Sequence, residues 1–274
     1  MTTWLSYKNW VDQEAATITA AEEAGDLVAT NLANRYSSSL WRDDTLTAMD
    51  ATTWFKVDFG VAREVGCLAL LFPRSNAPNS YDADPMFETT DTVRFKLSNV
   101  AEDGYELLDT TALASGVHAG YGYYVYKLTS PVTARWLRCD LNAVSRGSLG
   151  YVDVCRAWAG PVIEPAIGPD FGAVHAWSSD SVVTQAARGI SDFVDPREPI
   201  RSYAMTLGWL TEAERDQMED LERLMSTSGQ FLVVRGDMNV ARGAMFARQQ
   251  RSTGLEAIGA HLRHRKTFQL VESL

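Results

Sequence analysis

The sequence predicts a mainly β protein in two parts: a jelly-roll-like β-sandwich over residues 1–165 and a β-rich domain with one helix over residues 166–274. Apolar and polar residues alternate through most of Trp54–Trp158, a spacing that places every second side chain on one face of a strand. Gly160–Pro169 holds three prolines and two glycines, which places the boundary near residue 165. A chain of 274 residues is also long enough for two domains of about 100–200 residues each.

The strands of the first part are of two kinds. Phe55–Phe59, Val93–Leu97 and Leu137–Leu141 alternate strictly and predict half-buried strands. Val65–Phe72 and Tyr151–Trp158 are apolar on both faces, which is typical of strands packed on both sides. Turn residues separate these segments, so we expect an antiparallel sandwich.

The second part begins with one long alternating strand. Over Ile200–Trp209, the side chains of Tyr203, Met205, Leu207 and Trp209 are predicted to share one face.

A helix is expected directly after this strand. Thr211 and Glu214 have the spacing of a capping box, in which each side chain satisfies a free backbone amide of the other. Apolar residues then recur every three or four positions, which predicts an amphipathic helix over 211–228. Further strands are expected at Phe231–Val234, Gly243–Ala247 and Thr267–Val271.

Charge and composition exclude several classes of protein. The net charge is −10, with −8 in residues 1–165, so a broad basic face for nucleic acid is not expected. The longest apolar stretch, Val65–Phe72, is far shorter than the roughly 20 residues that span a bilayer, and no signal peptide is visible. Cys67, Cys139 and Cys155 form no CxxC pair and lie in apolar runs, so we expect buried free thiols.

Five segments of the first part follow one another in the order found in the discoidin, or coagulation-factor type C, family. They resemble the signature turn, the aromatic-x-x-Val-Asp-Leu-Gly strand, the Tyr-x-Pro-Arg segment, the Ala-Arg-Tyr-Val-Arg strand and the terminal strand of that family. In the same order, the segments of this chain are Asn31–Trp41, Trp54–Gly60, Leu71–Arg74, Ala134–Arg138 and Val152–Gly160. A sixth likeness is the strand Phe95–Ser98 with its later Asp103-Gly104 turn.

This resemblance implies a galactose-binding-like jelly roll that binds carbohydrate, lipid or protein through loops at one end. The candidate ligand-binding residues are Arg74, Tyr81, Asp82 and Tyr121. The aromatic run that begins at Tyr121 could stack on sugars or simply pack within a strand. Asn34 and Tyr36 stand where the family often has calcium-binding carboxylates, so no calcium is expected.

The second part resembles the domain shared by tail-tube and distal-tail proteins of tailed bacteriophages. The likeness lies in the order of strand, helix, strand and closing strand over Arg201–Trp209, Thr211–Met225, Gln230–Arg235 and Phe268–Glu272. It implies assembly into a ring by burial of apolar faces between copies. The candidate interface residues are Tyr203, Met205, Trp209, Arg235 and Arg248. The arginines from Arg235 to Arg265 could serve subunit contacts or form a solvated face.

We expect no catalytic, metal-binding or cofactor-binding residues. Asp82 and Asp84 could pair as glycosidase carboxylates, but Asp-x-Asp-Pro is common in turns. The His261 and His264 pair has no nearby carboxylate to complete a zinc site. Arg235-Gly-Asp237 matches an integrin-binding tripeptide but is also an ordinary turn. No GxSxG, P-loop or Cys-His nucleophile arrangement is present.

The sequence thus predicts a non-enzymatic virion protein, a ring-forming distal or minor tail component made in the host cytoplasm. Its expected partners are further copies of itself, with six as the expected number, neighbouring tail proteins and a host-surface glycan. The alternative is a carbohydrate-binding module of a cell-surface or polysaccharide-degrading system.

Overall fold

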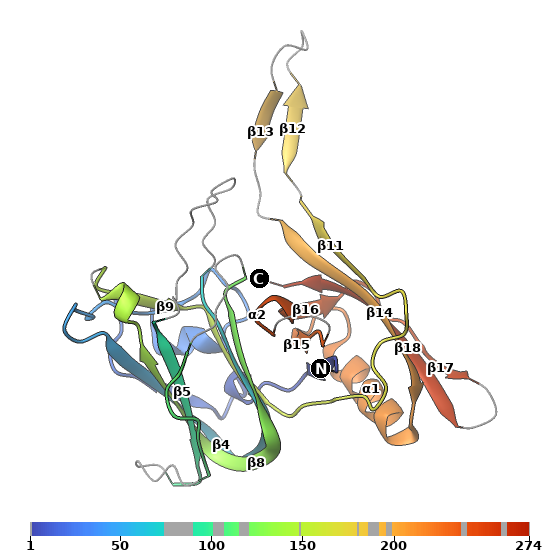
Figure 1. Cartoon of the computed structure of the whole chain (residues 1–274), viewed down its shortest axis with the longest axis horizontal. Coiled ribbons are helices and arrows are strands. Elements are labelled where there is room, and N and C mark those ends of the chain that lie inside the picture. Colours follow the sequence, from blue (N-terminus) through green and yellow to red (C-terminus); the bar gives the residue numbers. More distant parts are fainter. Residues whose placement is uncertain are drawn as a thin grey trace.

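The computed structural model shows two β lobes side by side, with a narrow hairpin rising from the second (Figure 1). The mainly β class with antiparallel sheets and one long helix, predicted from sequence, is confirmed. The structure describes residues 2–73, 90–100, 107–114, 121–147, 149–179, 181–185, 192–195, 199–236, 240–258 and 262–273.

The first lobe is built around two long strands, β4 (Thr52–Leu71) and β8 (Tyr123–Asn142), which pair along most of their lengths. Phe55, Val57 and Phe59 of β4 point into the core and alternate with partly exposed polar neighbours, as the spacing predicted. Two register shifts in the β4–β8 pair bend the sheet. Several strands predicted separately are therefore parts of these two continuous strands.

Shorter elements complete the first lobe. The main sheet has the order β10-β4-β8-β5-β6, with β2 beside β4 and β7 beside β5, and β3 pairs with β9 in a second layer. The bounds are β2 Thr17–Ala20, β3 Trp41–Asp43, β5 Thr92–Ser98, β6 Leu108–Asp109, β7 Leu113–Ala114, β9 Val152–Val154 and β10 Arg156–Gly160. Three 3-10 helices lie between strands: η1 Trp10–Asp12, η2 Ala29–Ala33 and η3 Val144–Arg146.

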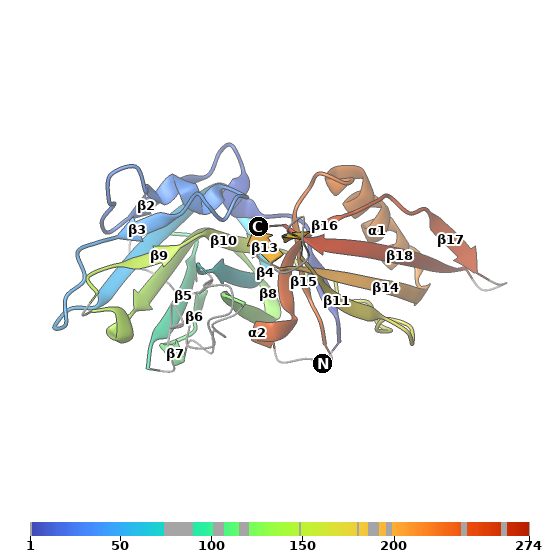
Figure 2. The ribbon, with the colours of Figure 1, turned by 90° about the horizontal axis from the view of Figure 1, so that it is seen from above.

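The second lobe is a seven-stranded sheet with α1 (Glu212–Met225) packed on it (Figure 2). The capping box of Thr211 and Glu214 is present, and Met218 and Leu221 form the buried face of the helix. The strand order is β1-β15-β16-β18-β14-β11, with β17 beside β18. The bounds are β1 Trp4–Ser6, β11 Val174–Ser178, β14 Ile200–Leu210, β15 Phe231–Val234, β16 Ala244–Gln249, β17 Leu255–Ile258 and β18 Arg263–Glu272. A single helical turn, α2 (Val240–Gly243), precedes β16.

The two lobes exchange segments of chain. Trp4–Ser6, at the start of the chain, pairs with β15 of the second sheet, although the sequence assigned residues 1–165 to the first domain. The connecting segment folds back onto this strand, since Leu5 and Ile163 form mutual backbone hydrogen bonds of 2.8 and 2.7 Å. The connection is therefore held by both lobes rather than free.

A shared core lies between the lobes. In β4, Leu68 and Leu70 belong to the core of the first lobe, whereas Cys67, Ala69 and Leu71 pack with residues of the second. The strand that the sequence predicted to be buried on both faces is thus covered by a different lobe on each face. All three cysteines are free and buried, as expected, and burial raises the pKa of Cys67 to about 12.

A buried polar network fastens this junction. The Tyr123 hydroxyl, from β8, donates to Glu272 Oε1 at 3.0 Å and accepts from the Phe246 amide at 3.1 Å. The Arg201 guanidinium donates to the same carboxylate at 2.5 and 3.0 Å and to two backbone carbonyls of residues 242 and 244. A tyrosine of the first lobe therefore completes an ion pair inside the second.

Candidate assembly surface

The second sheet ends in an exposed edge strand. Among the described residues, β11 pairs with β14 alone, and the side chains of its residues are half-buried or exposed. Val174 and Trp177 present apolar surface along it, with Trp177 44% exposed. An exposed edge strand that carries apolar side chains is a template for pairing with another chain.

The chain continues past β11 as a two-stranded arm. β12 (Val182–Gln185) and β13 (Asp192–Asp195) pair with each other and extend away from both lobes (Figure 1). Val182 and Val183 are exposed, the latter to 62%. An isolated two-stranded ribbon is marginally stable in water at best, so we expect this arm to pack against another surface.

A β-bulge turns Trp209 out of its predicted position. The register of β14 against β18 shifts between Leu207 and Leu210, and Trp209 has a φ of +60°. A bulky residue at positive φ is strained, and bulges often re-aim a side chain. Trp209 is consequently 55% exposed, and Leu210 occupies the inner position in its place.

The other predicted interface residues lie in different surroundings. Tyr203 and Met205 point into the core of their own lobe, because β14 alternates as predicted up to the bulge, so both serve packing within the chain. The Arg235 guanidinium lies over the Tyr203 ring at 4.8 Å. Arg248 is exposed on β16. Of the five predicted interface residues, Trp209 and Arg248 are the two whose side chains are exposed.

The ligand-binding candidate Tyr121 lies at the base of the arm. Its ring meets Trp177 edge-on at 5.8 Å, and the Arg201 guanidinium lies 5.0 Å from its centre. His175 packs edge-on against the same tryptophan at 6.1 Å. Tyr123 and Tyr124 are buried, so these two tyrosines of the aromatic run pack within the protein. These contacts anchor β11 to the junction between the lobes.

A second open edge lies on the opposite side of β18 from β14. Within the described residues, β17 pairs only with β18, and its side chains are half-buried or exposed. Its length, four residues, is close to the five of β11. The sheet therefore offers two edges of similar length that a neighbouring copy could extend.

Several predicted residues fall outside the described part of the chain. These are Arg74, Tyr81, Asp82, Asp84, Asp237 and His261. His264 is described and lies 3.5 Å from Arg215 Nη1. The described residues contain no group of three metal-binding side chains. In the same part of the chain, no helix is both long and apolar enough to cross a membrane.

The arm is the feature that sequence reasoning missed. Val182, Val183 and Thr184 are β-branched and follow a serine-rich turn, which is a strand signal. His175–Trp177 precedes that turn, so the pair of segments fits a hairpin. The hairpin is short, however, and nothing in its composition indicates that its outer half would stand apart from the body.

No family model matches this chain, and no curated protein matches it. Solved structures resemble part of it. A family 32 carbohydrate-binding module from Clostridium perfringens NanJ, in complex with galactose, is 18% identical and has a TM-score of 0.39, with 58% of this chain and 99% of the module covered.

A chitosan-binding module from Paenibacillus sp. IK-5 is 16% identical, with a TM-score of 0.40 and coverage of 57% and 99%. A fucose-binding module from Streptococcus pneumoniae is 9% identical, with a TM-score of 0.39 and coverage of 56% and 98%. These are carbohydrate-binding modules, and TM-scores below 0.5 transfer neither a ligand nor a role to this chain.

Proposed function

We propose that this protein is a structural, non-catalytic component of a phage or phage-derived tail, which assembles with copies of itself through the second lobe. The observation that carries the proposal is the arm: a β-ribbon with exposed Val182 and Val183 that continues from an apolar edge strand and extends away from both lobes. The resemblance of the second part to tail-ring proteins supports the same assignment.

The two open edges suggest how the copies would meet. Pairing of β11 in one copy with β17 in the next joins two different surfaces, and such a heterologous contact forms a ring if the rotation closes. The arm would then lie across the neighbour and bury Val182 and Val183. Trp209, held outward by a strained backbone, would supply a further apolar contact to a neighbouring copy. Six copies is the number that we propose.

The direct test is the mass of the full-length protein by light scattering, followed by negative-stain imaging. We expect a closed ring for the natural chain. A double change of Val182→Ser and Val183→Ser should give monomers, because it removes the apolar surface of the arm. Val61→Ser is the matched control, since Val61 is 52% exposed on the first lobe. A natural chain that stays monomeric at high concentration contradicts self-assembly.

We propose a second role for the first lobe, recognition of a carbohydrate at the host surface. The support is the discoidin-like order of its sequence segments, with Arg74 as the candidate ligand-binding residue. A glycan array probed with the full-length protein tests it. Binding that is lost in Arg74→Ala supports this role, and an array without any signal argues against it.

A further inference from the structure

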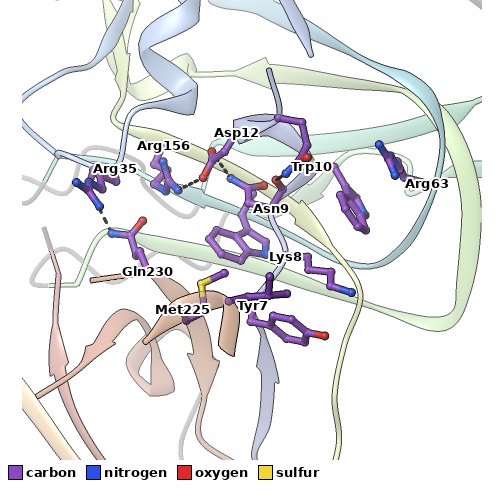
Figure 3. Close-up of a pocket in the computed structure, with 14 residues that line it drawn as sticks. Tyr7, Lys8, Asn9, Trp10, Asp12, Arg35, Arg63, Arg156, Met225 and Gln230 are labelled. Carbon is purple, nitrogen blue, oxygen red and sulfur yellow. Dashed lines mark hydrogen bonds and ion pairs between the residues drawn. The ribbon is translucent and has the colours of Figure 1, made fainter. Parts of the chain in front are cut away.

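A cleft of about 560 Å³ lies where the two lobes meet (Figure 3). Its walls come from η1 and the residues before it, from β4 and β10 of the first lobe, and from the end of α1 and Gln230 of the second. A cavity of this size is within the range of small-molecule sites. The cleft contains no residue of the arm.

The charge of this cleft is opposite to that of the whole chain. Lys8, Arg35, Arg63 and Arg156 line it, against the single carboxylate of Asp12, in a protein of net charge −10. Figure 3 shows Arg35 and Arg156 at one side and Arg63 beside Trp10 at the other.

The cations other than Arg156 have no carboxylate partner among the described residues. Arg35 is exposed, and its guanidinium donates only to the Ser228 carbonyl at 3.2 Å and to the Tyr36 hydroxyl at 3.4 Å. Arg63 lies over the Trp10 ring at 5.0 Å. Guanidinium groups with spare donors suit carboxylate ligands because their planar geometry matches the two oxygens.

Arg156 is buried at the floor of this positive region. It donates to Asp12 Oδ2 at 2.5 Å and to the Ala33 carbonyl at 3.0 Å, while its Nε–H has no partner. Burial lowers the pKa of Arg156, and the nearby charge of Arg35 acts in the same direction. Burial also raises the pKa of Asp12. The Asp12 carboxylate is paired with Arg156, and the nearby positive charge of Arg35 has no carboxylate partner among the described residues, so an added anion is favoured here.

Further polar groups of the wall have spare hydrogen-bonding capacity. Arg63 Nε and Gln230 Oε1 are buried without a partner. The Gln230 amide nitrogen already donates to the Ser273 carbonyl at 2.9 Å, so its oxygen is the group left to accept a hydroxyl. Trp10 is half-buried and adds an apolar surface, with its indole nitrogen held by the Glu64 carbonyl at 2.6 Å.

We infer that this interlobe cleft binds a small carboxylate-bearing ring compound that also carries hydroxyl groups. The carboxylate would lie at Arg35, beside Arg156, where positive charge is in excess. The apolar face of the ring would lie toward Trp10 and Arg63, and a hydroxyl would donate to Gln230 Oε1. The site goes beyond the proposed assembly function and does not depend on it.

Titration calorimetry of the full-length protein at low ionic strength tests this inference, with glucuronate as the probe. Methyl glucoside is the neutral probe with a similar ring, and inorganic phosphate is the anion without one. We expect glucuronate to bind more tightly than either. Arg35→Gln and Arg63→Gln should each weaken binding by about tenfold, the loss of one charge-assisted contact.

Arg94→Gln is the matched control, because it removes one positive charge from the first lobe away from the cleft and should leave glucuronate affinity unchanged. An unchanged urea midpoint in the Arg35 variant would show that its effect is on binding. The inference is overturned if glucuronate does not bind, if the Arg35 and Arg94 variants bind it equally, or if phosphate binds as tightly as glucuronate.

Discussion

The two lobes differ in what lies beyond the edges of their sheets. In the first lobe, β6 and β7 have two residues each, and the Asn9 side chain donates to the Ala157 carbonyl of β10 and accepts from its Ala159 amide. The four-residue β2 pairs only with β4 among the described residues, and no arm continues from it. In the second lobe, β11 is exposed and leads into the free-standing β12–β13 ribbon. Very short or covered edges disfavour strand addition, whereas an exposed apolar edge permits it. This difference is the reason why the proposed self-association is placed on the second lobe.

The largest effect is expected from breaking the joint between the lobes. Arg201→Ala leaves Glu272 as an uncompensated buried charge and removes an ion pair that Tyr123 completes. We expect a loss of about 3–5 kcal/mol in the free energy of unfolding, measured with urea. Arg94→Ala breaks the exposed pair with Asp109 and should cost no more than about 1 kcal/mol. Equal effects of the two changes would contradict the role given to the buried network.

Two neighbouring leucines test whether the lobes unfold together. Leu70 lies in the core of the first lobe and Leu71 in the core between the lobes, although both belong to β4. Leu70→Ala and Leu71→Ala should each cost about 2–5 kcal/mol, because each opens a cavity in a closed core. Urea unfolding followed by fluorescence and circular dichroism should give one transition that both changes shift. Two transitions, with only one of them moved by Leu71→Ala, would show that the lobes are independent.

The bulge at Trp209 allows the opposite kind of change, a gain in stability. Trp209→Gly removes a side chain from a strained φ of +60° and should stabilise the folded chain by about 1 kcal/mol. The same change should weaken self-association, which light scattering measures. Trp209→Ala is the control, since alanine keeps the strain and should give no gain. A loss of stability in the glycine variant would mean that the tryptophan packs within its own chain.

The smallest effect concerns the short edge of the first lobe. The hydrogen-bonded Arg94 guanidinium, which joins β5 to β6, lowers the pKa of Asp109 to about 2. Because the folded pKa lies below the unfolded value of about 3.9, this contribution is present above pH 4 and is lost as the pH falls toward 2. The pair is about one-third exposed, so solvent screening limits its contribution to less than about 1 kcal/mol. The difference in unfolding free energy between the natural chain and Asp109→Asn, followed against pH, should shrink over that range, and a constant difference would contradict it.

Local patterns in the sequence determined much of the fold. The alternation of Phe55, Val57 and Phe59 specified the inner face of β4, and the capping box at Thr211 specified where α1 begins. Burial of the three cysteines also followed from their apolar neighbours. These features depend on residues close together in the chain, whose periodicity is set by backbone geometry alone.

Contacts between distant segments decided the rest. The sequence indicated that both faces of Val65–Phe72 are buried, but only the tertiary structure assigns one face to each lobe. Trp4–Ser6 joins the second sheet, and a register shift against β18 turns Trp209 outward; neither has a local signal, because each depends on a partner strand far along the chain. The cleft arises in the same way: folding of the first lobe brings together Arg35, Arg63 and Arg156, which are far apart in sequence, and the second lobe adds Gln230 and the end of α1.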